Sequence, residues 1–128
     1  MSEKKRILVV DDEPDFVEIL KKALESEGFE VDVAYNGVEG LEKVNQNPPH
    51  AIALDVMMPE KDGYKMCAEL KADEKYEDIP VVMLTAVASH VSSTRYSHYD
   101  GMSMEADDYV PKGPDAVTEV VKSIKSLL

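Results

Sequence analysis

The sequence predicts an α/β fold, a doubly wound sheet of five parallel strands in the order 2-1-3-4-5 with helices on both faces. Strand-like and helix-like segments alternate five times along the chain, which is typical of right-handed strand–helix–strand crossovers. Most of the strand-like runs are continuously apolar, as expected of strands that are buried on both faces. The second run instead alternates apolar and polar residues, which predicts a strand at the edge of the sheet.

The first predicted strand spans residues 7–10, of which three are β-branched, and the first predicted helix follows it. Pro14 suits the first turn of that helix, because its missing N–H would have no partner there. Gly28 suits the end of the helix, where a left-handed backbone is common. The apolar positions that recur at helical spacing are Phe16, Ile19, Leu20, Ala23 and Leu24.

The second predicted strand lies in the segment EVDVAYN, residues 30–36, where Val31, Val33 and Tyr35 recur with a period of two. An Asn-Gly turn follows it and leads into a second helix. Two consecutive prolines end this helix. The residues expected on its inward face are Val38, Leu41 and Val44.

The third predicted strand spans residues 51–56, and a helix over residues 64–71 comes after it. The apolar side of this helix comprises Met66, Cys67 and Leu70. Cys67 is the one cysteine of the chain, so no internal disulfide can form, which agrees with a reducing compartment. We expect Cys67 to be a small core residue.

The fourth predicted strand spans residues 79–84, and a short fifth strand spans residues 108–110. Pro114 starts the last predicted helix. The residues expected to face inward from it are Val117, Val120, Val121, Ile124 and Leu127.

The charge balance limits the partners that the chain can bind. Its 26 acidic and 14 basic residues give a formal net charge of −12. Such a chain is repelled by nucleic-acid phosphates and anionic lipid, so we expect no direct nucleic-acid contact and no membrane insertion. No apolar stretch is long enough for a signal peptide or a membrane span. We therefore expect one cytoplasmic domain, residues 1–128.

Polar residues gather where the predicted strands end. Asp11 and Asp12 follow the first strand, Asp55 ends the third, Thr85 ends the fourth, and Lys112 follows the fifth. In a doubly wound sheet the ligand site lies at the carboxyl ends of the strands, between strands 1 and 3. Neighbouring strands lie about 4.8 Å apart, so three carboxylates would crowd one crevice.

Crowded carboxylates raise one another's pKa unless a cation lies between them. Oxygen ligands favour a hard ion, and Mg²⁺ is the natural candidate. A carboxylate, Mg²⁺, a hydroxyl and an ammonium group together suit the acceptance of a phosphoryl group. The carboxylate would attack phosphorus, while the other groups would bind the phosphoryl oxygens.

Each of these residues also has a plainer interpretation when it is considered alone. The acidic pair could be a helix N-cap, and Asp55 could be an acid in a turn. Thr85 could be a loop hydroxyl, and Lys112 a solvated surface charge. The joint placement at four strand ends favours a functional site.

The segments ILVVDDEP, ALDVMMPEKDG, VVMLTA and ADDYVPK resemble the response-regulator receiver domain of two-component signalling, of the chemotaxis-type single-receiver kind. The resemblance covers essentially the whole chain and implies a flavodoxin-like fold. It implies a phosphoryl donor that is a phosphohistidine on a sensor histidine kinase or a phosphotransfer protein. It further implies a downstream target, or an output domain absent from this chain.

The resemblance also implies roles for particular residues. Asp55 matches the phosphoacceptor, and Asp11 and Asp12 match the acidic pair that binds Mg²⁺. Met57 matches the position whose backbone carbonyl also binds the metal. The residues that match phosphoryl binding and switching are Thr85, Ala86, Tyr109 and Lys112. The switch is expected to alter the surface formed by helix 4, strand 5 and helix 5.

Two features depart from the family pattern. Gly113 follows Lys112 where the family usually has proline, and Pro111 precedes it. The segment 86–105 is longer than expected and rich in serine, so we expect helix 4 to be shortened, shifted or mobile. Its aromatic and imidazole side chains, at His90, Tyr96, His98 and Tyr99, are expected to be plain loop residues; a tyrosine patch for a partner and a two-histidine metal site are the alternatives.

Met57 and Val87 flank the expected phosphoryl site, and neither can orient an attacking water. We therefore expect slow autodephosphorylation. Three other functions stay open from the sequence: a flavodoxin-like cofactor binder, an aspartate-nucleophile phosphohydrolase, and a receiver-like interaction module that is never phosphorylated. The sequence leaves open whether the chain is a stand-alone receiver or part of a longer protein.

Overall fold

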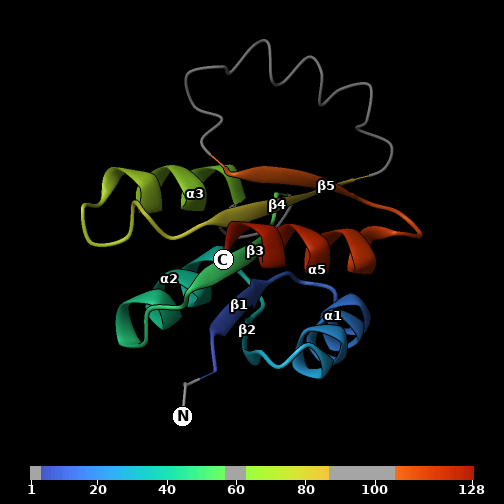
Figure 1. Cartoon of the computed structure of the whole chain (residues 1–128). Helices are drawn as coiled ribbons and strands as arrows, with labels where there is room; N and C mark the ends of the chain where they lie inside the picture. Colours follow the sequence, from blue (N-terminus) through green and yellow to red (C-terminus); the bar gives the residue numbers. More distant parts are fainter. Residues whose placement is uncertain (1–3, 57–62, 87–105) are drawn as a thin grey trace.

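The computed structural model describes residues 4–56, 63–86 and 106–128. Five parallel strands form one sheet in the order β2-β1-β3-β4-β5, which confirms the predicted order (Figure 1). The strands are β1 Arg6–Val10, β2 Glu30–Ala34, β3 Ala51–Asp55, β4 Val81–Ala86 and β5 Asp108–Lys112. The described helices are α1 Pro14–Ser26, α2 Gly37–Gln46, α3 Gly63–Ala72 and α5 Ala116–Leu127.

The sheet divides the core into two clusters, because successive side chains of a strand point to opposite faces. In β1, Leu8 and Val10 belong to the cluster under α2 and α3, whereas Ile7 and Val9 belong to the cluster under α1 and α5. Figure 1 shows these two pairs of helices on opposite faces of the sheet. The doubly wound architecture is thus confirmed.

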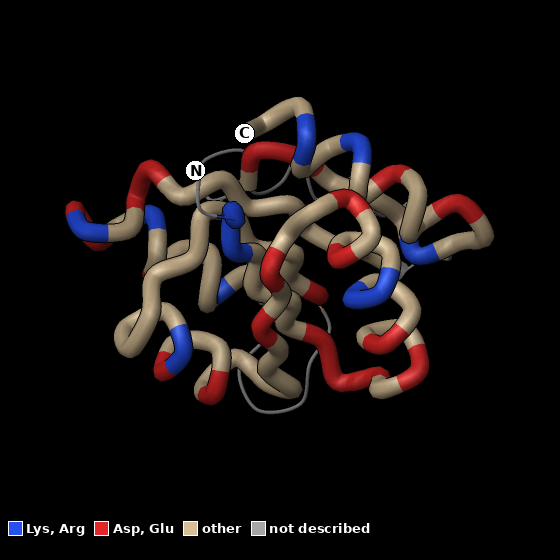
Figure 2. The backbone as a smooth tube through the Cα atoms, turned by 60° about the horizontal axis from the view of Figure 1, so that its bottom comes forward, with Lys and Arg blue, Asp and Glu red and all other residues tan. Residues whose placement is uncertain are grey.

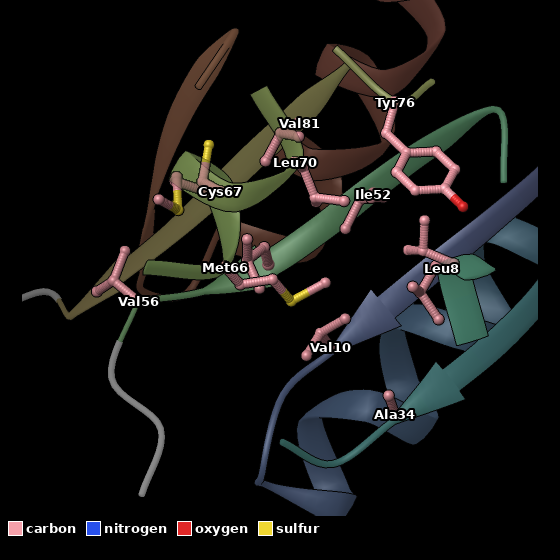
Figure 3. Close-up of a cluster of buried hydrophobic side chains, with 13 residues drawn as sticks. Leu8, Val10, Ala34, Ile52, Val56, Met66, Cys67, Leu70, Tyr76 and Val81 are labelled. Carbon is pink, nitrogen blue, oxygen red and sulfur yellow. The ribbon is translucent and has the colours of Figure 1, made fainter. Parts of the chain in front are cut away.

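The cluster under α2 and α3 is densely packed (Figure 3). Met66 and Cys67 are buried in it, as predicted, and the Met66 side chain extends toward Val10. Tyr76 closes the far end of the cluster, and its hydroxyl donates to Asn45 Oδ1 at 2.7 Å. The hydroxyl partner removes the cost of leaving a polar group at the edge of the core.

Helix α1 begins and ends where the sequence predicted, but the prediction that Ile19 belongs to its apolar face is wrong. Pro14 is in its first turn, and Gly28, with φ of 94°, directly follows the C-cap Glu27. Ile19 is exposed rather than buried, and Val17 is buried instead. The buried stripe Val17, Leu20 and Leu24 follows the spacing i, i+3, i+7, and residue 19 lies off that stripe.

β2 is half-buried at its three central residues, as predicted for an edge strand, but it stops at Ala34. The N–H of Tyr35 donates to Glu39 Oε1 at 2.7 Å, so it is used by the following helix and not by the sheet. Asn36 caps that helix by accepting from the Glu39 N–H at 2.8 Å. The predicted inward position of Val38 is wrong; it is exposed, because α2 packs through its glycines and Val44.

The last two strands differ from the predicted bounds. β4 begins two residues later than predicted, after Pro80, whose carbonyl accepts from the Ile52 N–H at 2.9 Å. β5 is longer than predicted and includes Pro111. Proline is tolerated there because β5 lies at the edge of the sheet. Lys112 is consequently the last residue of a strand and not a loop residue.

Lys71 holds together the segments that lead into β4 and β5. Its Nζ donates to the carbonyls of Glu77 and Ile79 at 3.1 and 2.9 Å and lies 3.2 Å from Asp107 Oδ2. The same Asp107 oxygen accepts from the Val81 N–H at 2.8 Å. The start of β4 and the start of β5 are thereby joined through one ammonium group. This join holds the edge strand that carries Lys112.

Helix α5 covers its face of the sheet with the predicted residues, which are buried or partly buried. Within the described ranges, every helix is too short or too polar to cross a bilayer. The expectations for Met57, Val87, helix 4 and the side chains at His90, Tyr96, His98 and Tyr99 lie outside the described residues.

Candidate functional site

Asp11 and Asp55 lie side by side at the carboxyl end of the sheet. The register of β1 and β3 pairs Val10 with Leu54. The residues that come next, Asp11 and Asp55, therefore carry their carboxylates at the same level of the sheet. The Asp11 N–H donates to the Ala34 carbonyl at 3.0 Å, which continues the ladder one step beyond β1. Both side chains are buried, with exposed fractions of 0% and 6%. Asp11 and Asp55 therefore lie together at the ends of their strands, as predicted.

Asp12 completes a group of three carboxylates with Asp11 and Asp55. One oxygen from each lies within 4.8 Å of the others, and Asp12 is the exposed member. Oxygen ligands of Mg²⁺ lie about 2.1 Å from the ion, hence up to about 4.2 Å from one another, so a small contraction would suit this ion. The buried Asp11 Oδ2 already faces a positive charge, the Lys112 ammonium, so its surroundings suit a cation. The donor set fits a hard divalent cation.

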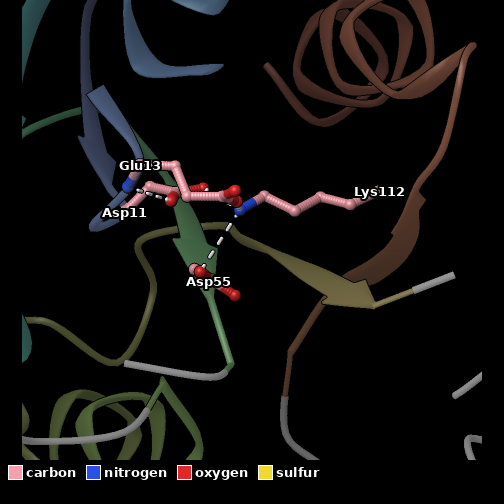
Figure 4. Close-up of polar contacts among 4 residues, drawn as sticks. All are labelled: Asp11, Glu13, Asp55 and Lys112. Atoms are coloured by element: carbon pink, nitrogen blue, oxygen red, sulfur yellow. Dashed lines mark hydrogen bonds and ion pairs between the residues drawn. The ribbon is translucent and has the colours of Figure 1, made fainter. Parts of the chain in front are cut away.

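Lys112 reaches this group from β5 (Figure 4). Its Nζ lies 2.8 Å from Asp11 Oδ2 and 3.3 Å from Asp55 Oδ2, and it also contacts Glu13 Oε1. The ammonium group lies 4.8 Å from the centre of the Phe16 ring, in a cation–π contact. Only 14% of the Lys112 side chain is exposed, so its interpretation as a solvated surface charge is wrong.

The electrostatics of the site follow from burial and from Lys112. Burial raises the pKa of Asp11, although the Lys112 ammonium and the Glu13 N–H oppose the rise. Burial alone would lower the pKa of Lys112, but its contacts with Asp11 and Glu13 and the charge of Asp55 outweigh it and raise the pKa. Lys112 therefore stays cationic and partly neutralises the carboxylates around it.

The loop after β1 holds the acidic residues in place. Asp11 Oδ1 accepts from the Glu13 N–H at 2.9 Å, which bends the chain toward α1. The N-cap of α1 is Glu13, with no side-chain cap hydrogen bond, so the interpretation of the Asp11–Asp12 pair as the helix cap is wrong. The sequence analysis gave Glu13 no place in the site; its contact with Lys112 joins residues 99 positions apart, which no local pattern reveals.

Thr85 and Ala86 end β4 beside this group. The β3–β4 register pairs Asp55 with Leu84, so Thr85 lies one residue beyond the level of Asp55. Thr85 is buried, at 4% exposure. The β4–β5 register pairs Ala86 with Lys112, which puts these two backbones at the same level of the sheet.

Tyr109 lies on the face covered by α2 and α3, packed against that cluster. Its hydroxyl oxygen is buried. Burial raises the pKa of this phenol, and the backbone N–H of Ala106 opposes the rise.

Gly63 is a second residue that the sequence analysis missed. Its N–H donates to the Val56 carbonyl at 3.0 Å, and a Cβ here would lie 2.2 Å from the Asp55 carbonyl oxygen. The first residue of α3 thus packs directly against the main chain of Asp55. The Lys-Asp-Gly sequence before α3 carries the signal, because glycine at a helix start can mark a close backbone approach.

Acidic residues extend well beyond the site. They outnumber basic residues along the described backbone and are spread over it (Figure 2). The site is thus a group of carboxylates within an acidic molecule, with the Lys112 ammonium as the positive charge among them. Such an arrangement can bind a divalent ion and, through that ion and Lys112, a small anion such as a phosphoryl group.

Comparison with known proteins agrees with this geometry. Residues 7–125 match the family model described as the response regulator receiver domain. Response regulator MprA of Mycobacterium sp. (strain KMS) is 41% identical over 123 residues, which are 96% of this chain and 50% of that protein. MprA of Mycobacterium leprae (strain TN) is 42% identical over the same shares. The chain spans about half the length of the curated relatives it matches.

Solved structures show the same fold. The response regulator protein TrrA from Thermotoga maritima, in complex with Mg²⁺–BeF, has a TM-score of 0.80 and 37% identity, covering 97% of this chain and 99% of that one. The CheY-like receiver domain protein from Methanospirillum hungatei JF-1 has a TM-score of 0.79 and 29% identity, covering 97% and 93%. The predicted resemblance and fold class are confirmed.

Proposed function

Since the chain belongs to the family of response regulator receiver domains, which act in two-component signalling, we propose that it accepts a phosphoryl group on Asp55 in a Mg²⁺-dependent reaction. The observation that carries the proposal is the place of Asp55, beside two further carboxylates and 3.3 Å from the Lys112 ammonium. Each of these groups has a use in phosphoryl transfer, and no other described group of acidic side chains with this geometry was found.

The proposed donor is a phosphohistidine of a sensor histidine kinase or of a phosphotransfer protein. An Asp55 carboxylate oxygen forms a bond to phosphorus while the phosphorus–nitrogen bond breaks, and the imidazole nitrogen keeps the electron pair. Lys112, which already contacts Asp55 Oδ2, moves only slightly to pair with a phosphoryl oxygen. The chain thereby catalyses its own phosphorylation and its later dephosphorylation.

We assign the metal to Asp11, Asp12 and Asp55, with the backbone carbonyl of Met57 as a further ligand. Bound Mg²⁺ would offset the negative charge on the phosphoryl oxygens. Asp11 is suited to this role because its buried carboxylate lies within 4.8 Å of those of Asp12 and Asp55. Asp12 is exposed, so it is suited to an ion that keeps part of its water shell.

We assign the response to phosphorylation to Thr85, Ala86 and Tyr109. Thr85 and Ala86 end the strand next to β3, from which the hydroxyl and a backbone N–H would bind phosphoryl oxygens. Tyr109, partly buried against the cluster under α2 and α3, would change its side-chain position when Thr85 moves toward the phosphoryl group. The surface of helix 4, β5 and α5 would then shift its population and signal to a downstream target or an output domain.

The wider assignments follow from the family. Residues 1–128 form the receiver domain, and its working place is the cytoplasm, where a kinase would reach it. The MprA relatives are about twice as long as this chain, which leaves room in them for an output domain. The acidic surface suits basic protein partners rather than nucleic acid.

The decisive experiment is incubation with acetyl phosphate and Mg²⁺, followed by intact-mass measurement. We expect the mass to rise by one phosphoryl group, and Asp55→Ala to abolish the rise. No rise in the wild type would favour an interaction module that is never phosphorylated. Turnover of small phosphate esters would favour a phosphohydrolase, and a yellow purified protein would favour a flavin binder.

A further inference from the structure

Lys112 is shared among three carboxylates that differ sharply in their environment. Its Nζ contacts Asp11, Asp55 and Glu13, as Figure 4 shows. The side chains of Asp11 and Asp55 are 0% and 6% exposed, whereas that of Glu13 is 63% exposed. The ammonium group has three N–H donors, so its contacts are already complete before any phosphoryl group arrives.

A phosphoryl oxygen that binds Lys112 must therefore displace one of these carboxylates. Displacing Asp11 would take the ammonium away from a fully buried carboxylate and leave that carboxylate with the metal alone, which is costly. Asp55 is itself the proposed attachment point of the phosphoryl group, so it stays close to Lys112. Displacing Glu13 only returns an exposed carboxylate to water, where it is well solvated.

Apart from its contact with Lys112, the Glu13 side chain does not stabilise the start of α1. Glu13 is the N-cap of α1, but its side chain makes no cap hydrogen bond. The backbone serves the helix instead, because the Glu13 carbonyl accepts from the Val17 N–H at 3.0 Å. A change of the side chain therefore leaves the start of the helix intact.

We propose that Glu13 is a positioning residue that competes with the phosphoryl group for Lys112. In the unphosphorylated protein Glu13 holds the ammonium group, and on phosphorylation it releases Lys112 to the phosphoryl oxygens. Glu13 thereby weakens the phosphorylated state relative to the unphosphorylated one. The inference rests on the proposed function, since it concerns the same phosphoryl group.

The test is the affinity for beryllofluoride, a phosphoryl analogue, at saturating Mg²⁺ in the wild type, Glu13→Gln and Asp15→Asn. Saturation is checked for each protein by Mg²⁺ titration beforehand. Asp15 is the matched control, because it is exposed in the first turn of α1 and loses the same charge. We expect Glu13→Gln to bind beryllofluoride about two- to five-fold more tightly, within the range for one partly exposed ion pair. Asp15→Asn should stay close to the wild type.

The result also separates this inference from the proposed function. Equal tightening of beryllofluoride binding in both variants would overturn the proposed competition, because the loss of charge alone would then explain it. No tightening in Glu13→Gln would also overturn it, because Glu13 would then not compete for Lys112. A wild type that binds no beryllofluoride and gains no mass with acetyl phosphate would overturn the proposed function as well. A wild type that does both, beside a Glu13→Gln variant no tighter than Asp15→Asn, would overturn only the role of Glu13.

Discussion

Gly63 and Asp55 are packed main chain against main chain. A Cβ on Gly63 would lie 2.2 Å from the Asp55 carbonyl oxygen and 2.8 Å from its carbonyl carbon. Backbone cannot move aside as a flexible side chain can, so residue 63 has to be glycine if Asp55 is to keep its place. The start of α3 thus determines where the proposed phosphoacceptor stands.

Gly63→Ala should displace Asp55 and lower both stability and metal affinity. We expect the free energy of unfolding to fall by about 2–4 kcal/mol, because the added methyl group meets rigid backbone. Mg²⁺ affinity should fall with it, since one of the three carboxylates moves. Urea unfolding and Mg²⁺ titration by calorimetry measure the two effects.

Gly40→Ala is the matched control for that variant. Its Cβ would lie 2.9 Å from Met66 Cε, the far end of a flexible side chain. We expect a loss of about 1 kcal/mol and unchanged Mg²⁺ affinity. If Gly63→Ala bound Mg²⁺ as the wild type does, the claim that Gly63 positions Asp55 would be wrong.

Asp12→Asn should separate metal binding from stability. Asp12 is the exposed member of the carboxylate group, and removal of its charge relieves repulsion in the metal-free protein. We expect the unfolding free energy without Mg²⁺ to stay the same or rise by up to about 0.5 kcal/mol. The increase in Tm caused by Mg²⁺ should be largely lost.

Asp115→Asn removes an equal charge at the N-cap of α5, where the side chain makes no cap hydrogen bond. It should keep the Mg²⁺-dependent rise in Tm. Thermal unfolding with and without Mg²⁺ compares the two variants. A full Mg²⁺ response in Asp12→Asn would exclude Asp12 from the metal site.

Lys112→Met should weaken the metal-free protein and strengthen Mg²⁺ binding. The buried carboxylates of Asp11 and Asp55 lose their cation, which we expect to cost about 1–3 kcal/mol of unfolding free energy in EDTA. Mg²⁺ then meets less compensated negative charge and should bind more tightly. Lys122→Met, an exposed position on α5, should change neither quantity. Weaker Mg²⁺ binding in Lys112→Met would contradict the assigned electrostatics.

The pH dependence of the Lys112 contribution follows from its raised pKa. A lysine whose folded pKa lies above its ordinary 10.5 stabilises the fold fully below that pH and loses the contribution as pH rises through the folded pKa. The difference in unfolding free energy between wild type and Lys112→Met, in EDTA, should therefore be constant from about pH 7 to 9.5. A difference that fell away within this range would mean that burial lowers the pKa instead.

Most of the fold could be predicted because its signals are local. Continuous apolar runs such as residues 7–10 indicate strands buried on both faces, and alternation in residues 30–36 indicates an edge. The errors come from positions next to the buried stripe. Ile19 and Val38 fit helical spacing, but the direction in which a helix packs depends on tertiary contacts that periodicity does not contain.

The residues of the candidate site also divide into those that the sequence could predict and those that it could not. Asp11, Asp12, Asp55 and Lys112 could be predicted because strand order brings strand ends together. Glu13 could not, since its contact with Lys112 joins residues 99 positions apart, and for Gly63 the Lys-Asp-Gly sequence indicates a close backbone approach without showing which main chain it meets. Both contacts depend on the tertiary arrangement of distant segments, which a pattern of residue types does not determine.

The most direct measurement is the site of phosphorylation itself. Phosphorylated protein, prepared with acetyl phosphate and Mg²⁺, is reduced with borohydride, digested and sequenced by mass spectrometry. The account predicts that the reduced, formerly acyl-phosphorylated residue is Asp55 alone, and that EDTA prevents its formation. Modification at another residue, or equal modification without Mg²⁺, would contradict it.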